Sequence, residues 1–474
     1  MRLIITTLLA SLHLCGTAGA QDQSPPQTQD GSLRQASSVD KAMADRQDRP
    51  NVLVIMVDDI GYADLSAYGS TDLQTPNLDQ LVSEGMRFNQ FYSNSPVCSP
   101  TRAAFLTGRF PELVGMHGVT RLHSKDSWGY LAPDATMLPE LFREAGYTTT
   151  LIGKWHLGLS EPNLPNQRGF DEFHGFVLGM MDDYWEHSRQ GMQQMRRNET
   201  PIFPDGHATD LITEWSIEAM ERDVAKGQPF FQFLAYNAPH FPVQPPIEWL
   251  ARVKAREPGL SETRALMVAF VEHLDDAIGQ VLRTVDELGI RDNTIVVFTS
   301  DNGGLVKVGS NNGLLRGGKA QVYEGGIMVP TCIRFPGRIE DDQTTDFKAM
   351  TMDLLPTIAE LCGISIDHEI DGDSFAELLL SGEQAPFDRV VYHRWLQKYQ
   401  TKEYIREGDW KLLQDPWNPV DRRDEITYEL YNLADDPHEE NDLAAAMPEK
   451  VHELAEKLQA HVLRAQQVEW QRPE

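Results

Sequence analysis

Cysteine, positive charge and long apolar runs are all scarce in this sequence. Its 474 residues include only four cysteines, and 42 Lys and Arg stand against 71 Asp and Glu, which gives a formal net charge of −29. A protein that binds nucleic acid by neutralising phosphates needs the opposite balance, and the same repulsion disfavours anionic membrane surfaces. Beyond the first twenty residues there is no run of about 18 apolar residues, so we expect no membrane insertion. With 41% hydrophobic residues, the chain can still bury a large core.

The first twenty residues have the features of a secretory signal peptide. Arg2 is followed by an apolar run from Leu3 to Leu14 and then by small residues. Residues 21–49 are rich in Gln, Ser, Asp and Pro, which predicts a disordered linker. We therefore expect a secreted or periplasmic protein. Removing residues 1–20 also removes Cys15, and the three cysteines that remain are an odd number, so at least one of them is free or chemically special.

Four short apolar runs rich in β-branched and aromatic residues predict buried strands, and a polar cluster directly follows each of them. The runs cover residues 52–57, 148–152, 230–236 and 294–300. The clusters are Asp58-Asp59, Gly153-Lys154-Trp155-His156, Asn237-Ala238-Pro239-His240 and Asp301-Asn302-Gly303-Gly304. Helical patterns between the runs cover residues 75–85, 134–146 and 261–289.

This alternation predicts an α/β fold in which helices cover both faces of a large, mostly parallel sheet. Ligands bind such sheets at the carboxyl ends of the strands, so the four clusters predict one composite active site. We expect the catalytic domain to cover residues 50–385. A small α+β subdomain is expected over residues 386–474, with antiparallel strands at 404–413 and 426–433 and a terminal helix at 449–466.

Two of the clusters offer only oxygen ligands. Asp58-Asp59 and Asp301-Asn302 carry the carboxylate and amide oxygens that hard cations such as Ca²⁺ and Mg²⁺ prefer. Adjacent carboxylates repel each other unless a cation, Lys or Arg compensates them. The alternative is that they cap a helix and form a plain turn. Because two such clusters follow predicted strands, metal binding is favoured.

The segment that contains Cys98 predicts a short helix. Pro100 lies near its start and Gly108 just past its end, so Cys98 lies close to a helix N-terminus, where the backbone favours an anion. Arg102, one turn further on, adds a positive charge. Taken alone, a cysteine at such a position is usually structural.

The segment from Cys98 to Gly108, with Cys-Ser-Pro-Thr-Arg at its start and Thr-Gly at its end, resembles the signature of the formylglycine-dependent sulfatases. Further motifs extend the resemblance, in order, over nearly the whole mature chain. They are Val57-Asp58-Asp59, Gly153 to Gly158, Ala238-Pro239-His240, Asp301-Asn302-Gly303, Gly318-Lys319 and Tyr323 to Gly326. The resemblance implies an alkaline-phosphatase-like fold and a formylglycine-generating maturation enzyme as a partner. It also explains the odd number of cysteines, because Cys98 would be the precursor of formylglycine. Cys332 and Cys362 are left as either a disulfide pair or two buried thiols.

The resemblance implies a metal site and a nucleophile. The ligands of one divalent ion, usually Ca²⁺, would be Asp58, Asp59, Asp301, Asn302 and the modified Cys98. Formylglycine at position 98 would act as its hydrate. One hydroxyl would attack sulfur and release the alcohol, and the other would lose its proton and expel sulfate.

The remaining matches imply roles in proton transfer and anion binding. Arg102 would stabilise the hydrate, His156 would help to deprotonate it, and His240 would protonate the leaving oxygen. Lys154 and Lys319 would hold sulfate oxygens. The alternatives are core histidines and surface lysines.

Substrate contacts are predicted at three further positions, His117, Asp182 and Asp183. His117 follows the signature helix, and either aspartate is a candidate acceptor for a sugar hydroxyl. Trp128, Trp155 and Trp185 are candidate faces for stacking a sugar, and the alternative is that they are buried core residues. The prediction is thus an exported sulfuric ester hydrolase acting on a sulfated carbohydrate. Two alternatives stay open: a phosphodiesterase or phosphonate monoester hydrolase on the same fold, and a non-catalytic sulfated-glycan binder with unmodified Cys98.

Overall fold

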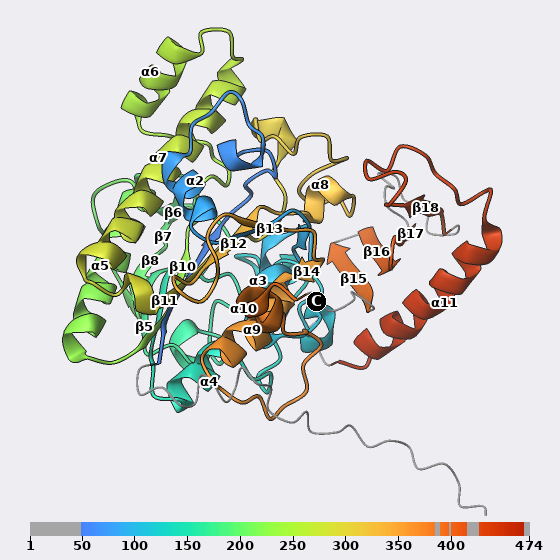
Figure 1. Cartoon of the computed structure of the whole chain (residues 1–474), viewed down its shortest axis with the longest axis horizontal. Coiled ribbons are helices and arrows are strands. Elements are labelled where there is room, and N and C mark those ends of the chain that lie inside the picture. The colour runs from blue at the N-terminus through green and yellow to red at the C-terminus, as the bar shows by residue number, and fades with distance from the viewer. Residues whose placement is uncertain (1–48, 384–388, 398–399, 415–425, 469–474) are drawn as a thin grey trace, which may run out of the picture.

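The computed structural model describes residues 49–383, 389–397, 400–414 and 426–468 of the chain (Figure 1). The predicted signal peptide and nearly all of the predicted linker lie outside the described residues, as does the predicted domain boundary after residue 385. Within the described ranges, no helix is both long enough and apolar enough to cross a bilayer. We use the name catalytic domain for residues 49–383 and the name C-terminal subdomain for residues 389–468.

A ten-stranded sheet forms the centre of the catalytic domain, in the order β13-β2-β12-β11-β1-β10-β4-β5-β8-β9. Its five central strands run parallel, and four of them were predicted. They are β11 (Thr294–Ser300), β1 (Asn51–Val57), β10 (Phe230–Ala235), β4 (Thr148–Lys154) and β5 (Glu172–Phe176). Antiparallel pairing enters on both sides, where β12 (Thr331–Arg334) joins β11 and β8 (Met195–Arg197) joins β5. The sheet is therefore mixed, with a parallel centre. Shorter strands are β2 (Met86–Phe88), β13 (Gln343–Thr345), β9 (Thr200–Pro201), β3 (Phe91–Tyr92), β14 (Ala349–Met350), β6 (Ser188–Arg189) and β7 (Met192–Gln193).

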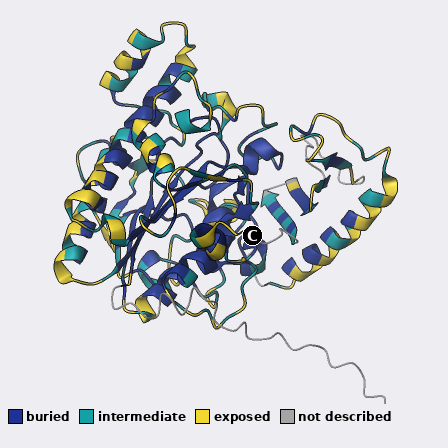
Figure 2. Cartoon of the chain, viewed as in Figure 1, coloured by how far each residue is buried: buried dark blue, intermediate teal, exposed yellow. Residues whose placement is uncertain are grey.

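Helices cover both faces of this sheet, and β1, β10 and β11 are buried throughout (Figure 2). Side chains of β1 alternate between the two faces, since Val52, Val54 and Met56 join one core and Leu53, Ile55 and Val57 join the other. The first face is covered by α3 (Cys98–Thr107), α4 (Leu138–Glu144), α9 (Leu354–Leu361) and α10 (Ala376–Ser381). The second is covered by α2 (Pro76–Ser83), α5 (Ala208–Lys226) and α7 (Glu262–Glu287), with α6 (Ile247–Arg256) packed on α7.

The predicted helices are present with small changes at their ends. The pattern over 261–289 is α7, and Ser261 caps it by accepting a hydrogen bond from the backbone N–H of Arg264. The pattern over 134–146 forms a helix only from Leu138, where Pro139 occupies the first turn. The three described cysteines are free thiols. Cys332 and Cys362 belong to the cores on opposite faces of the sheet, so they do not form a disulfide.

The C-terminal subdomain contains a four-stranded antiparallel sheet covered by one helix (Figure 1). Its elements are β15 (Val390–Gln397), β16 (Gln400–Glu407), β17 (Trp410–Gln414), β18 (Tyr428–Asn432) and α11 (Pro448–Ala465). The segment 404–413 is not one strand, because Gly408 has a φ of +61° and turns the chain between β16 and β17. The predicted strand at 426–433 and the predicted terminal helix correspond to β18 and α11.

Buried ion pairs join this subdomain to the catalytic domain. Lys411 in β17 is fully buried, and its Nζ lies 2.7 Å from a carboxylate oxygen of Glu324 in α8 (Glu324–Ile327). Glu112, in the short 3₁₀ helix Pro111–Val114, accepts a hydrogen bond of 2.7 Å from Nε2 of His461 in α11. Because each of these pairs would leave an uncompensated charge if it were broken, they fix how the subdomain docks.

Gly153 in β4 lies where two strands approach closely. Its φ is +102°, and a Cβ atom there would lie 2.1 Å from the carbonyl oxygen of Ala235 in β10. We expect Gly153→Ala to lower the free energy of unfolding by about 2–4 kcal/mol, because neighbouring backbone must move and alanine is strained at this φ. Urea denaturation measures the change. Gly259→Ala, with no atom near its Cβ, is the control and should change stability by less than about 0.5 kcal/mol. Equal losses of stability in the two variants would contradict the close approach of β4 and β10 at Gly153.

Docking of the subdomain should depend on pH through Glu112. Burial raises the pKa of this carboxyl, but the hydrogen bond and charge of His461 outweigh burial, so the net pKa lies below 4.5. A lowered pKa stabilises the fold above the unfolded-state pKa, and this contribution is lost as the pH falls. We expect Glu112→Gln to lower stability by about 1–3 kcal/mol at pH 7, and by less at pH 4. Melting curves of both proteins between pH 4 and 7 test this, and a constant difference would contradict it.

Candidate active site at the carboxyl edge of the sheet

The register of the parallel strands brings the four predicted clusters together. Val57 pairs with Ser300, and Ala235 pairs with Gly153, so the strands end at nearly one level. The loops beyond these ends are also joined directly. The backbone N–H of Asp301 donates to the carbonyl of Val57 at 3.1 Å, and that of Asp58 donates to the carbonyl of Ala238 at 3.2 Å. The composite site is therefore formed by the topology of the sheet.

Cys98 lies at the centre of this cluster. It is the first residue of α3, as predicted, and it is 2% exposed. Its Sγ donates to Oδ1 of Asp58 at 3.4 Å and accepts from Nζ of Lys319 at 3.5 Å. Burial, and secondly the charge of Asp58, raise the pKa of the Cys98 thiol to about 12. At neutral pH this thiol is thus protonated, and it is a poor nucleophile in its unmodified form.

The charges around Cys98 balance in pairs. Nζ of Lys154 lies 2.5 Å from Oδ2 of Asp58, and Nζ of Lys319 lies 2.6 Å from Oδ1 of Asp59. Burial raises the pKa of Asp59, but Lys319 and His240 outweigh burial, and the pKa falls to about 2. These contacts offset the repulsion between the two adjacent carboxylates.

Arg102 compensates the third carboxylate. Its Nε and Nη2 donate to Oδ2 of Asp301 at 3.1 and 2.8 Å, and its Nη1 donates to the backbone carbonyl of Lys154 at 3.1 Å. Even so, burial and then Asp58 raise the pKa of Asp301 to about 6. Three carboxylates and three basic side chains thus share one buried volume. The prediction that Arg102 stabilises a hydrate stays a prediction, since its contacts here are to Asp301 and to the backbone.

Four side chains of this cluster form a possible metal-binding group. Asp58, Asp59, Cys98 and His240 each offer a ligand atom, and these atoms all lie within 4.8 Å of one another. The Nδ2 group of Asn302 donates to Oδ1 of Asp59 at 2.8 Å, which leaves its Oδ1 buried without a hydrogen-bond partner. A buried oxygen without a donor is costly unless a cation satisfies it. The presence of His240 in this group was not predicted.

His156 is held in a defined tautomer. Its Nε2 lies 2.8 Å from the carbonyl oxygen of Thr120, so this nitrogen carries the hydrogen and donates it. Its Nδ1 is buried without a partner, and Gly179 packs directly on the ring, where a Cβ would lie 2.2 Å from Nε2. Burial, then the charges of Lys154 and Arg102, lower the pKa of His156 well below 6.5. The ring is therefore neutral, and its Nδ1 can accept a proton.

His240 has a different arrangement. Its Nδ1 lies 2.6 Å from the carbonyl oxygen of Phe241, so the neutral ring carries its hydrogen there, and Nε2 lies 3.7 Å from Oδ2 of Asp59. Burial, and then Lys319, lower the pKa of His240 to about 3. The predicted donation of a proton to a leaving oxygen requires a hydrogen on Nε2, and thus an imidazolium. The role of His240 as proton donor to the leaving oxygen stays a prediction, and it requires a protonated ring.

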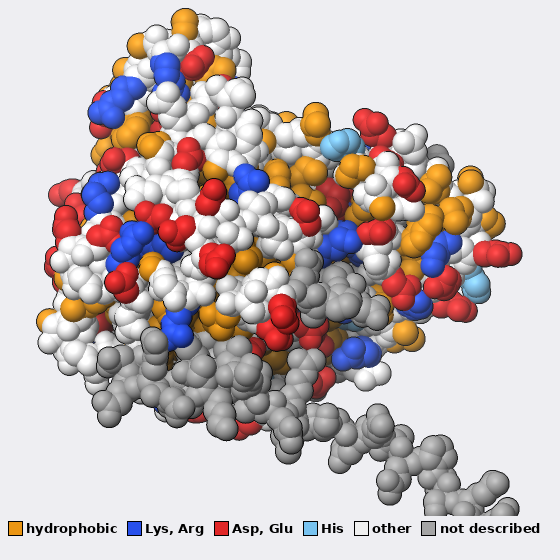
Figure 3. Space-filling model, in the orientation of Figure 1, with side chains coloured by type: hydrophobic (Ala, Val, Ile, Leu, Met, Phe, Trp, Pro, Cys, Tyr) orange, Lys and Arg blue, Asp and Glu red, His pale blue; other side chains and the backbone are white. Residues whose placement is uncertain are grey.

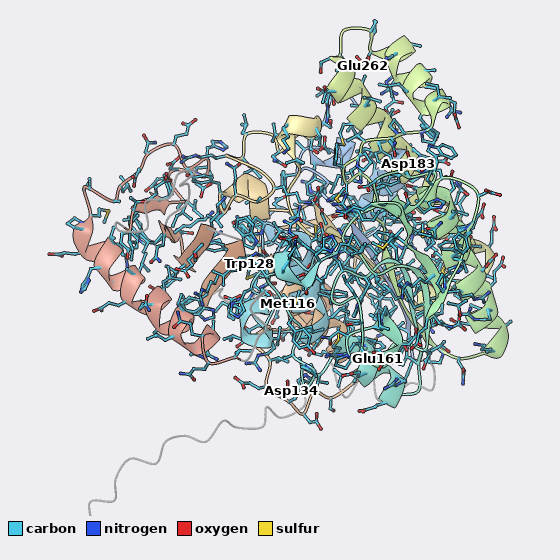
Figure 4. All side chains as sticks on the ribbon, turned by 180° about the vertical axis from the view of Figure 1, so that it is seen from behind. Met116, Trp128, Asp134, Glu161, Asp183 and Glu262 are labelled. Carbon is cyan, nitrogen blue, oxygen red and sulfur yellow. The ribbon has the colours of Figure 1, made fainter. Side chains whose placement is uncertain are left out.

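Three further residues, His117, Asp182 and Asp183, were predicted to contact the substrate. His117 is buried, and burial lowers its pKa to about 4. Asp182 binds Arg189 and the backbone N–H of Gln190. Asp183, which is labelled in Figure 4, accepts hydrogen bonds from two backbone N–H groups of its own loop and from Nε2 of Gln244. All three residues stay predictions as substrate contacts.

The three predicted sugar-stacking tryptophans differ in exposure. Trp155 is fully buried and its Nε1 donates to the carbonyl of Asn163, so that prediction is wrong for Trp155. Trp128 is partly buried beside Gly118, and Trp185 is 49% exposed. Only the latter two can offer a face to a ligand.

Sequence reasoning missed the residues that hold the His240 loop. The hydroxyl of Tyr184 donates to the carbonyl oxygens of Asn237 and His240, at 2.6 and 2.9 Å, and the backbone N–H of Tyr184 donates to Oε1 of Gln244. Tyr184 adjoins the predicted Asp183, but no motif marks it, because its partners lie more than 50 residues away. A second group of potential ligands, His207, Asp210 and His273, lies between α5 and α7 and is already joined by a 2.7 Å contact between His273 and Asp210.

Comparisons with known proteins agree with this geometry. A family model described as Sulfatase matches residues 50–364, and one described as N-sulphoglucosamine sulphohydrolase, C-terminal, matches residues 318–468. The chain is 33% identical over 368 residues to N-acetylgalactosamine-6-sulfatase of Homo sapiens, covering 73% of this chain and 68% of that protein. It is 31% identical over 468 residues to arylsulfatase A of Bos taurus, covering 88% of each.

A solved structure supports the same assignment. Ps i-CgsB in complex with k-i-k-neocarrahexaose has a TM-score of 0.79 and 29% sequence identity to this chain, covering 90% of this chain and 94% of that one. The first family model spans well over half of the sequence, and the fold, the strand-end clusters and the curated relatives all agree with it. The chain therefore belongs to the sulfatase family, within the alkaline phosphatase superfamily, and is a sulfuric ester hydrolase.

Proposed function

We propose that this protein is an exported sulfatase that hydrolyses sulfate esters of a carbohydrate, using formylglycine formed from Cys98 and one divalent cation, Ca²⁺. The observation that carries the proposal is the position of Cys98. Its Sγ lies between Asp58 and Lys319, at the first residue of a helix and at the carboxyl edge of the sheet. An anion bound beside it would meet a helix N-terminus and two lysines.

Modification of Cys98 is supported by the chemistry of its thiol. A buried thiol with a pKa of about 12 is not a nucleophile at neutral pH. Formylglycine would supply a geminal diol, which offers one oxygen to attack sulfur and a second to expel sulfate. In this site Nδ1 of His156 is the buried acceptor that can take a proton, since Nε2 already donates to Thr120.

The cation would be held by Asp58, Asp59, Asp301 and Asn302. These residues supply carboxylate oxygens and one buried amide oxygen that has no hydrogen-bond partner. When bound, the ion polarises a sulfate oxygen. Hard oxygen ligands of this type favour Ca²⁺ or Mg²⁺, and Ca²⁺ is the ion implied by the family.

The basic side chains suit a sulfate group. Lys154, Lys319 and Arg102 balance the three carboxylates, so a divalent cation would leave the site with net positive charge. The surface in Figure 3 carries acidic side chains with basic ones interspersed, in keeping with a net charge of −29. Attraction of the substrate would thus be confined to the buried site, where charges interact more strongly than in water.

A carbohydrate substrate and export are supported by separate observations. One relative is named for N-acetylgalactosamine 6-sulfate, and a structural neighbour was solved with an oligosaccharide. Trp185, exposed beside the loop of Asp183, offers an aromatic face to a sugar. The charged start and apolar centre of residues 1–20 support export.

Mass spectrometry of the tryptic peptide 88–102 tests the nucleophile. We expect loss of the thiol in favour of an aldehyde or its hydrate, and we expect Cys98→Ala to lower kcat/KM on an aryl sulfate by at least about 10³-fold. Cys332→Ala, which removes a core thiol far along the chain, is the matched control and should keep activity. An unmodified thiol in a fully active protein would reject formylglycine. Faster hydrolysis of aryl phosphate diesters than of aryl sulfates would favour the alternative enzyme class.

Removal and return of Ca²⁺ tests the metal site. After treatment with a chelator, Ca²⁺ at 100 times its Kd should stabilise the protein by about 2.7 kcal/mol, because it binds only the folded state. Asn302→Leu removes one ligand oxygen and should weaken Ca²⁺ binding in calorimetry by at least about tenfold. Asp210→Asn alters the His207, Asp210 and His273 group and should leave Ca²⁺ binding unchanged. If Asp210→Asn weakened Ca²⁺ binding and Asn302→Leu did not, the ion would be placed in the group of His207, Asp210 and His273.

A further inference from the structure

The β15–β16 hairpin of the C-terminal subdomain contacts the segment that carries Lys319 and the segment that carries His117. From β16, Nζ of Lys402 donates to the backbone carbonyl of Ala320 at 2.6 Å. From β15, the backbone N–H of Leu396 donates to the carbonyl of His117 at 2.7 Å. The second contact is a close one, since a Cβ on Gly118 would lie 2.2 Å from the carbonyl oxygen of Leu396. The hairpin is therefore fixed against the catalytic domain at two separate points.

Ala320 directly follows Lys319, whose Nζ contacts both Asp59 and Cys98. The backbone here is unusual, because Ala320 has a φ of +65°. Such a conformation is strained for alanine and persists only where surrounding contacts impose it. Three contacts do so: the N–H of Lys319 donates to Gly304 at 3.1 Å, the N–H of Ala320 donates to Pro96 at 2.8 Å, and Lys402 holds the carbonyl of Ala320.

Lys402 is not a surface lysine. It is 4% exposed, and it pairs across the hairpin with Trp395, so its ammonium lies 5.1 Å from the centre of the buried indole ring. Burial lowers the pKa of Lys402 to about 8. Placing an ammonium in such surroundings is costly, and the carbonyl of Ala320 and the ring of Trp395 offset part of that cost. The side chain therefore serves a specific contact.

We propose that Lys402 is a positioning residue for sulfate-ester hydrolysis: it holds the backbone at Ala320 so that the side chain of Lys319 reaches Asp59 and residue 98. The proposal rests on the function proposed above for Cys98 and Lys319. It gives the C-terminal subdomain a part in the active site, through the backbone that carries Lys319. Lys402 acts through Lys319 and not on the substrate itself.

A double-mutant cycle tests this role. Lys402→Met keeps the length of the side chain and removes its donor, and we expect kcat/KM on a small aryl sulfate to fall by about 10–100-fold. Lys402→Arg keeps a charged donor and should retain most of the activity. In a Lys319→Met background, Lys402→Met should cost less than about twofold, because the group that it positions is already absent. Additive losses would overturn the proposal, as would wild-type kcat/KM in folded Lys402→Met.

A control and a second readout complete the test. Lys457→Met removes another lysine of the same subdomain, which binds Glu407, and should leave kcat/KM unchanged. If Lys402→Met does not fold, Lys402→Leu and Lys402→Arg take its place, and equal activity of those two would overturn the proposal. Inorganic sulfate binding by calorimetry gives a measure independent of turnover. A wild-type protein that binds sulfate but hydrolyses no sulfate ester would refute the proposed function. In that case the positioning role predicts that Lys402→Met binds sulfate about tenfold more weakly than the wild type, and an unchanged affinity would overturn it.

Discussion

The parallel arrangement of β1, β4, β10 and β11 is the constraint on which the rest of the structure depends. Parallel strands end at the same edge, so whatever follows them is brought together regardless of distance along the chain. Here the residues that follow are Asp58, Lys154, His240 and Asp301. Their charges could not share a buried volume unless carboxylates and basic groups alternated, and the ion pairs of Asp58 with Lys154 and of Asp301 with Arg102 supply that alternation.

The same edge holds backbone strain. Asp59, His156 and Ala320 all have φ values near +65°, although none is glycine. Each such residue costs about 1 kcal/mol or more, so surrounding contacts must fix it. Asp59 is held by Lys319 and Asn302, and the ring of His156 is held between Thr120 and Gly179. Rigid loops of this kind let a site keep charged groups in fixed positions while a substrate enters and leaves.

The sequence predicted the parts of the protein that depend on neighbouring residues. Four of the five central strands, the helix that begins at Cys98 and the strand-end clusters follow from short patterns and were found. The antiparallel edges of the sheet, β5 and the turn at Gly408 were not predicted, because they depend on packing or on one residue's conformation. The burial of Trp155 was expected only as the alternative to a stacking face. Contacts such as that between Lys402 and Ala320 join residues 82 positions apart and leave no local pattern. A reading of one sequence cannot find them.

The enclosure of Cys98 also has a consequence for timing. Its neighbours come from far downstream: Lys319 lies 221 positions later, and Asp301 lies 199 positions after Arg102. A ribosome adds about 5–20 residues per second, so roughly 10–40 s pass between the synthesis of residue 98 and that of Lys319. Any agent that acts on this thiol has that interval in which to reach it. The order of the residues along the chain thus delays the enclosure of residue 98 until the segment that carries Lys319 has been made and has folded.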